Sequence, residues 1–126
     1  MHPANLKYSP QHFWLKQESE NLVRIGLTYH YQKQLGNIVY LEMPACGMQL
    51  VQGQPCGAIE SNKASSDLIS PVSGKLAEVN RDLEANPGLI NKDPYGEAWL
   101  MAVDTSGCPV PTELMSARQY LDSVSQ

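Results

Sequence analysis

The grouping of apolar residues constrains the fold most: they come in short runs, and Gly, Pro, Asn or Asp separates most of these runs. "LVRIGL" (22–27) and "GKLAEV" (74–79) alternate large apolar residues with polar or small ones. Successive side chains of a strand point to opposite faces, so this alternation indicates half-buried strands. The sequence predicts a mostly β sandwich or barrel; further short strands are expected at "FWL" (13–15), "NIVYLEM" (37–43), "GAIES" (57–61), "DLIS" (67–70) and "AWLMAV" (98–103).

Two segments favour helix instead. In "TYHYQKQLG" (28–36), Thr28 is a suitable N-cap and Gly36 a suitable C-terminal stop. In "PTELMSARQYLDSV" (111–124), apolar residues recur at near-helical spacing, which predicts a helix from Pro111 and Thr112 onward, laid on the sheet through Leu114, Ala117 and Leu121, with Tyr120 beside them. The stretch 83–99 has two prolines and two glycines in a polar context and predicts a long loop.

Length and charge narrow the class of protein. The 126 residues suit one domain, 1–126, with a single core. The net charge is −4 and the nine Lys and Arg are scattered, which argues against a nucleic-acid partner. The sequence has no apolar run long enough for a bilayer, and its N-terminus resembles neither a secretory signal nor a transit peptide. We therefore expect a cytoplasmic monomer that does not bind membranes.

The cysteines and histidines give no pattern of a metal or disulfide site. Cys46, Cys56 and Cys108 are odd in number and lack C-x-x-C spacing, so they are expected to be reduced thiols. The three histidines, His2, His12 and His30, contain no pair with metal-ligand spacing. No metal is predicted.

One lysine stands in an unusual setting. Lys63 lies in the polar break of "ESNKASSD" (60–67) between two short predicted strands, so it is expected at the protruding tip of a hairpin. Small neighbours leave it reachable by another enzyme, and Glu60 and Asp67 lie at the shoulders of the hairpin. A solubilising surface lysine is the ordinary interpretation. A lysine that receives an acyl group is the alternative interpretation.

The sequence around Lys63 resembles the lipoylation site of the glycine cleavage system H protein family, whose members read close to "ESVKAASD" and then "PVSG". Family members place a glutamate three residues before the modified lysine and a glycine eleven residues after it, and Glu60 and Gly74 match both. The likeness extends from about Leu6 to Tyr120 and includes "LKYSPQHFWL", "LGNIVYLEMP", "NPGLIN" and "PYGEAWL". A biotin carrier would place methionines where Asn62 and Ala64 stand.

The resemblance implies a barrel-sandwich hybrid with short peripheral helices. It implies lipoate on Lys63, a swinging arm that carries an aminomethyl group and reducing equivalents. The implied partners are glycine decarboxylase, aminomethyltransferase, dihydrolipoyl dehydrogenase and a lipoyl ligase or transferase. The chain itself would be a carrier and not an enzyme. His30 and Asp67 match positions that the family associates with the resting cleft of the arm; as alternatives, His30 packs a short helix and Asp67 caps a turn.

Some residues depart from the family pattern. Phe13 stands where "HEW" has a glutamate that helps to hold the loaded arm, and Asn62 replaces the usual valine. Lys92 and Asp93 also stand where small or acidic residues are more usual. Cys46 and Cys108 are not expected in ordinary members, and exchange of either thiol with a bound dithiol is conceivable, although no neighbour activates them.

Three other functions remain open. An H-like carrier could serve heterodisulfide-reductase-like sulfur oxidation or relay lipoate to other proteins. An enzyme that forms a Schiff base on Lys63 would need a desolvated lysine or a cationic neighbour, and an exposed polar turn supplies neither. A structural protein with an unmodified Lys63 is the third alternative.

Overall fold

The computed structural model describes residues 5–107 and 114–124. The described elements follow in the order β1 (Lys7–Tyr8), β2 (Phe13–Gln17), β3 (Leu22–Leu27), α1 (Tyr29–Leu35), β4 (Ile38–Glu42), β5 (Gln49–Leu50), β6 (Pro55–Ser61), β7 (Ser65–Ile69), β8 (Gly74–Val79), α2 (Asp82–Ala85), α3 (Leu89–Lys92), β9 (Met101–Asp104) and α4 (Ala117–Val124). No helix within these residues has the length and apolar character needed to span a membrane.

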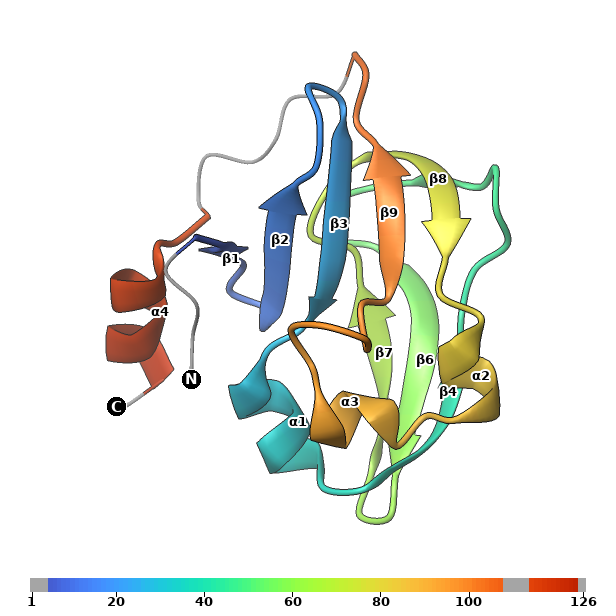
Figure 1. Cartoon of the computed structure of the whole chain (residues 1–126), viewed down its shortest axis with the longest axis vertical. Coiled ribbons are helices and arrows are strands. Elements are labelled where there is room, and N and C mark those ends of the chain that lie inside the picture. Colours follow the sequence, from blue (N-terminus) through green and yellow to red (C-terminus); the bar gives the residue numbers. More distant parts are fainter. Residues whose placement is uncertain (1–4, 108–113, 125–126) are drawn as a thin grey trace.

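The strands form two sheets, as Figure 1 shows. Among the described residues, one sheet has the strand order β1-β2-β3-β9-β8-β5 and the other has the order β4-β6-β7. The paired strands run antiparallel. The predicted mostly β fold is therefore confirmed.

The main hydrophobic core holds side chains from both sheets. Strand β3 shows why the alternation in the sequence was informative: Val23, Ile25 and Leu27 are almost fully buried, whereas Leu22 and Arg24 are partly exposed. Residues of the smaller sheet join the same core, namely Leu41, Ile59 and Leu68. Burial of such side chains typically stabilises a fold by about 1.5–3 kcal/mol each.

Helix α1 follows the prediction closely. The Thr28 side chain accepts a hydrogen bond from the Tyr31 N–H at 3.2 Å, and the Gly36 N–H donates to the Gln32 carbonyl at 3.0 Å. Gly36 has φ 89°, a conformation that glycine adopts without the cost that a Cβ would bring. In Figure 1 the helix lies at the end of the sheets where the β6–β7 hairpin turns.

The structure corrects three predictions. Residues 83–99 are not a plain loop, because α2 and α3 lie within or at the edge of that stretch. Strand β9 begins at Met101, so Ala98 to Leu100 precede it. The last helix begins at Ala117, because Met115 pairs with Tyr8 as an isolated β-bridge; Pro111 and Thr112 lie outside the described residues.

Helix α4 packs through a residue that its apolar spacing did not select. Tyr120 is fully buried, whereas Leu121 is 49% exposed. Tyr120 belongs to a small second cluster with Leu6, Tyr8 and Trp14, and its ring stacks on Tyr8 with centroids 5.0 Å apart. This cluster attaches α4 beside β1 and β2, away from the main core.

Candidate functional site

Lys63 lies at the tip of the β6–β7 hairpin, as predicted. Glu60 pairs with Ser65 as the last registered pair, and the Ser61 N–H donates to the Ala64 carbonyl at 2.8 Å. The Ser61 hydroxyl also accepts from the Lys63 and Ala64 N–H groups, both at 3.1 Å. Lys63 is exposed, and no carboxylate in the described part of the chain forms an ion pair with it.

The tip is fixed to the loop that follows α1. The Asn62 N–H donates to the Asn37 carbonyl at 3.0 Å, and the Asn37 N–H donates to the Asn62 side-chain oxygen at 3.2 Å. The Lys63 side chain passes over Gly36: a Cβ at Gly36 would lie 3.3 Å from Lys63 Cε and 2.8 Å from Asn62 Oδ1. The absence of a side chain at Gly36 therefore leaves room for the lysine to lie along the end of α1.

A side chain that sequence reasoning did not single out holds this loop. Asn91 Nδ2 donates to the Gly36 carbonyl at 2.8 Å and to Gln32 Oε1 at 2.9 Å. Asn91 Oδ1 accepts from the Ile38 N–H at 2.9 Å. Asn91 thus binds both sides of the turn between α1 and β4. It is the last residue of "NPGLIN", so the motif pointed to the segment but not to this contact.

A cavity of about 530 Å³ lies beside α1. Its lining residues come from the loop between β1 and β2, from α1 and from the C-terminal segment: Pro10, His12, His30, Gln34, Met115, Ser123 and Val124. His30 and Gln34 are four residues apart and so share one face of α1. At about 1.5 Å per residue, α1 rises roughly 9 Å along its axis between His30 and Gly36, the residue over which Lys63 lies.

Two histidines meet in this cavity. The His12 and His30 rings have centroids 5.2 Å apart. His12 has φ 72°, an uncommon conformation outside glycine that its backbone contacts with Ser9 and Thr28 hold. Burial lowers the pKa of His12 from its usual 6.5, and the neighbouring His30 lowers that pKa further. The sequence offered His12 no role, because its partners are far away along the chain.

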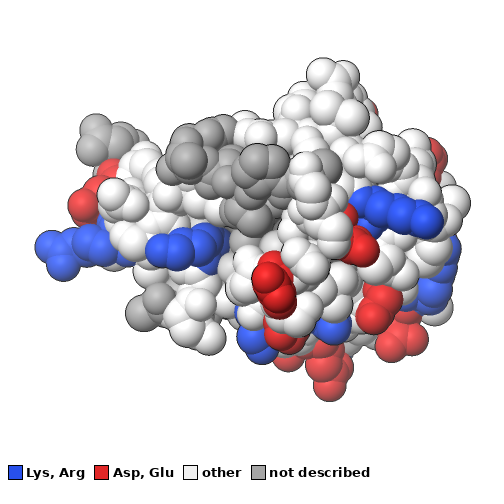
Figure 2. Space-filling model, turned by 90° about the horizontal axis from the view of Figure 1, so that it is seen from above, with Lys and Arg blue, Asp and Glu red and all other residues white. Residues whose placement is uncertain are grey.

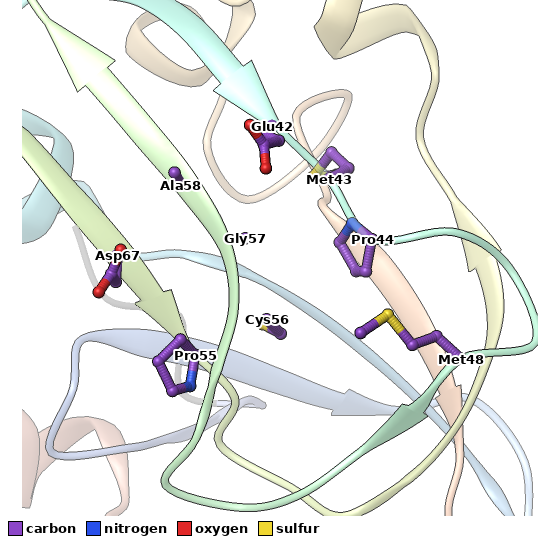
Figure 3. A pocket seen from close by; sticks show the side chains of 9 residues that line it. All are labelled: Glu42, Met43, Pro44, Met48, Pro55, Cys56, Gly57, Ala58 and Asp67. Atoms are coloured by element: carbon purple, nitrogen blue, oxygen red, sulfur yellow. The ribbon is translucent and has the colours of Figure 1, made fainter.

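Asp67 and His30 line different cavities. Asp67 borders a second cavity of about 410 Å³, whose lining residues are Glu42, Met43, Pro44, Met48, Pro55, Cys56, Gly57, Ala58 and Asp67. Figure 3 shows Glu42 and Asp67 on either side of Ala58, and both are registered with Ala58 in the sheet. The structure therefore groups Lys63, Glu60 and Asp67 on one hairpin and places His30 on α1.

Gly74 lies in the larger sheet, as the first residue of β8. A Cβ at this position would overlap the Asp104 carbonyl oxygen and would lie 2.8 Å from Val103 Cγ1. Both neighbours belong to β9, which pairs with β8. The glycine thus permits two strands to approach each other, and it does not contact Lys63.

Phe13 faces the main core. Its side chain is 1% exposed and packs with core residues such as Leu15 and Leu27. The ring is therefore not presented to the cavity, although the preceding residue, His12, is.

The described cysteines differ in their surroundings. Cys56 borders the second cavity, and burial raises the pKa of its thiol to about 11, which disfavours the reactive thiolate. Cys46 is exposed, and Cys108 lies outside the described residues. Within residues 5–107 and 114–124, no group of three His, Cys, Asp or Glu side chains is arranged to hold a metal ion.

Among the described residues on the face shown in Figure 2, charged side chains do not gather into a broad basic surface. On the face shown in Figure 2, Lys and Arg are interspersed with Asp and Glu. Two described ion pairs join Glu18 to Lys16 and Arg24, and a third joins Arg81 to Glu84. A protein surface that tracks phosphates would instead gather Lys and Arg on one face.

Comparisons with known proteins identify the family. Residues 6–126 match the family model described as glycine cleavage H-protein. The glycine cleavage system H protein of Halalkalibacterium halodurans is 44% identical over 98% of this chain and 96% of its own length. The protein of that name from Coprothermobacter proteolyticus is 42% identical over 96% of this chain and 95% of its own length. The one from Mycobacterium tuberculosis is 35% identical over 98% of this chain and 97% of its own length.

A solved structure gives the same result. The crystal structure of a glycine cleavage system H protein from Mycobacterium marinum matches with a TM-score of 0.88 and 32% identity, covering 98% of this chain and 99% of that one. In class, the molecule is a barrel-sandwich hybrid that presents a lysine on a hairpin, as expected. The chain belongs to the glycine cleavage H-protein family.

Proposed function

We propose that this chain is the cytoplasmic lipoyl-carrying H component of a glycine cleavage system, with lipoate attached to Lys63. The family membership and the names of the relatives support this function over sulfur oxidation or lipoate relay. The observation that carries the proposal is the presentation of Lys63: it is exposed, unpaired with any described carboxylate, and held on a tip that two hydrogen bonds fix to Asn37.

The residues around Lys63 fit the cofactor. The exposed amine is accessible to a lipoyl ligase or transferase, and Glu60 on the hairpin shoulder is the acidic contact such an enzyme would meet. Gly36 provides the space through which the lysine side chain passes. When bound, lipoate would supply the dithiol chemistry that accepts the aminomethyl group and electrons.

The cavity beside α1 is the proposed resting place of the arm. His30 and Gln34 line this cavity from α1, and His12 lines it from the loop before β2. The apolar wall from Met115 and Val124 would exclude water from part of the arm, and the polar groups would orient it. Asp67 borders another cavity, so in this chain we assign it to the surface that partner enzymes meet and not to the resting cleft.

The proposed carrier has no catalytic residues of its own. Its partners would be a glycine decarboxylase, an aminomethyltransferase and a dihydrolipoyl dehydrogenase, and each would act on the arm in turn. The protein contributes position and shelter. These roles need an exposed lysine and a cleft within its reach.

The test uses Lys63→Arg and a matched control, Lys75→Arg, which changes another exposed lysine on β8. Each protein is co-expressed with a lipoyl ligase and analysed by intact mass, and the lipoylated form is then incubated with a glycine decarboxylase and labelled glycine. We expect Lys63→Arg to carry no lipoyl mass and Lys75→Arg to behave as the unchanged protein. Lipoyl mass on Lys63→Arg would overturn the attachment site. A lipoylated protein that a competent decarboxylase does not load would overturn the glycine cleavage function.

A further inference from the structure

The turn from α1 into β4 is bound by asparagines from two other elements. Asn62 comes from the hairpin tip: its N–H donates to the Asn37 carbonyl at 3.0 Å, and its Oδ1 accepts from the Asn37 N–H at 3.2 Å. Asn91 comes from α3: its Nδ2 donates to the Gly36 carbonyl at 2.8 Å, and its Oδ1 accepts from the Ile38 N–H at 2.9 Å. Three consecutive residues thus join the lysine-bearing tip to α3.

The Asn91 side chain is matched to this place by its chemistry. Nδ2 has two protons and two acceptors, because it also donates to Gln32 Oε1 at 2.9 Å. A reversed amide would set its oxygen against the Gly36 carbonyl and its NH2 group against the Ile38 N–H, so the two backbone contacts fix its orientation. Aspartate has nearly the same shape but lacks both donor protons, and alanine lacks all three contacts.

The Lys63 side chain lies along the turn that Asn91 holds. A Cβ at Gly36 would lie 3.3 Å from Lys63 Cε and 3.5 Å from Lys63 Cδ. Within the described part of the chain, Lys63 forms no ion pair that would direct its amine. The direction of the side chain therefore depends on the backbone around it, namely on the tip and on the turn over which it lies.

Half of the link at the tip depends on a residue in which the chain departs from the family pattern. Valine is usual where Asn62 stands, and a valine side chain has no hydrogen-bond acceptor. A valine would keep the bond from its N–H to the Asn37 carbonyl and lose the bond from the Asn37 N–H. Asn62 thus gives this tip a second bond to the turn, and Asn91 holds the turn itself.

We propose that Asn91 is a positioning residue for the acylation of Lys63: it keeps the hairpin tip in the orientation that a lipoyl ligase or transferase binds. It acts through residues 36–38 and the bonds between Asn37 and Asn62. The inference rests on the proposed attachment of lipoate to Lys63. A tip that is ordered before docking loses little further freedom when the enzyme binds it. A tip that moves among several orientations presents the competent one for only a fraction of the time, and its apparent affinity falls by that fraction.

The first experiment measures lipoylation of the full-length, unlipoylated carrier by a lipoate ligase, with lipoate and ATP saturating and the carrier concentration varied. Asn91→Asp and Asn91→Ala are compared with Asn86→Ala, a change at the first residue of the same "NPGLIN" segment. Asn86 is exposed, and its side chain forms no hydrogen bond within the described residues. We expect both Asn91 variants to raise KM for the carrier roughly five-fold with kcat unchanged, because the order of the tip is lost before binding. Asn86→Ala should leave both constants unchanged.

Carrier concentrations are those of folded protein, measured by urea denaturation, so a loss of stability alone leaves KM unchanged. An unchanged KM in both Asn91 variants, or an equal rise in Asn86→Ala, would overturn the positioning role. An unchanged protein that accepts no lipoate would overturn the attachment to Lys63 and the inference with it.

The second experiment tests the route from Asn91 to the tip. KM is measured for Asn62→Val, for Asn91→Asp and for the double variant. We expect the double variant to raise KM by less than the product of the two single factors, because both changes act on one connection. The Asn62 N–H, which Asn91 does not contact, should also exchange with solvent faster in Asn91→Asp than in the unchanged protein and in Asn86→Ala, relative to the amides of β3. A factor equal to the product, or equal exchange at Asn62, would overturn the inference.

Discussion

Gly74→Ala tests whether this glycine serves the sheet or the lysine-bearing turn. An alanine Cβ would overlap the Asp104 carbonyl oxygen and lie 2.8 Å from Val103 Cγ1. The oxygen belongs to the backbone of β9 and Val103 is fully buried, so neither can move aside as a flexible side chain would. Overpacking of this kind typically costs about 1–3 kcal/mol, and we expect a loss near 3 kcal/mol in the free energy of unfolding.

The matched control is Gly88→Ala. Gly88 has φ −64°, which any residue adopts, and its nearest neighbour to a built Cβ is Asn86 Oδ1 at 3.6 Å. A glycine-to-alanine change at such a site stabilises a protein by about 0.4–1 kcal/mol, because it restricts the unfolded chain. The two variants therefore have opposite expected signs, although each adds the same single carbon.

The assay is urea denaturation followed by the fluorescence of the two tryptophans, Trp14 and Trp99. Lipoylation by a ligase is measured in parallel and normalised to the folded fraction. We expect Gly74→Ala to lose stability and yet to accept lipoate at the normal rate, because Lys63 lies on a hairpin of the other sheet. A Gly74→Ala protein as stable as Gly88→Ala would refute the packing argument. Normal stability with slow lipoylation would show that the ligase recognises this glycine.

Two further predictions follow from burial. Phe13→Glu should lower the free energy of unfolding by about 4 kcal/mol or more, because it removes a ring that is 1% exposed and puts an ionisable group in the main core. Urea denaturation measures this loss of stability. A loss below about 1 kcal/mol would show that the carboxylate reaches water. The pKa of His12 is lowered in the folded state, so the unfolded chain binds the proton more readily. The free energy of unfolding should therefore fall as the pH drops through about 6.5, by at most about 1.4 kcal/mol per pH unit. His12→Asn should flatten the dependence of stability on pH between pH 7.5 and 5, and asparagine tolerates the positive φ of this position. An unchanged dependence would show that another group causes it.

Strands and the lysine hairpin could be predicted because their signals are local. In β3, buried and less buried residues alternate from Leu22 to Ile25, and the predicted range 22–27 agrees with the observed one. The tip at Lys63 follows from a polar break between two apolar runs. Helix α1 has a capping residue at one end and a glycine at the other, and both act as expected.

The missed features depend on contacts far apart in the sequence. Helices α2 and α3 have four residues each and no side-chain cap, so the sequence contains no periodic pattern that would predict them. The late start of α4 reflects the pairing of Met115 with Tyr8, which no local signal contains. His12 and Tyr120 are 108 residues apart, and their contact becomes visible only in the fold. Periodicity favoured Leu121 as a buried residue of α4, whereas the hydrogen bonds of Tyr120 favour the tyrosine.

Helix α1 runs from the loop that holds the lysine tip to the cavity lined by His12 and His30, and it is too short to form by its own stability. A seven-residue helix is unstable in isolation, so side-chain contacts at its two ends must hold it. At the N-terminal end, Thr28 caps the helix and bonds to Tyr120. At the C-terminal end, Asn91 binds the Gly36 carbonyl, and the following residue, Asn37, binds the tip that carries Lys63. We therefore expect a change at either end to shift the lysine relative to the cavity, even where the changed residue touches neither.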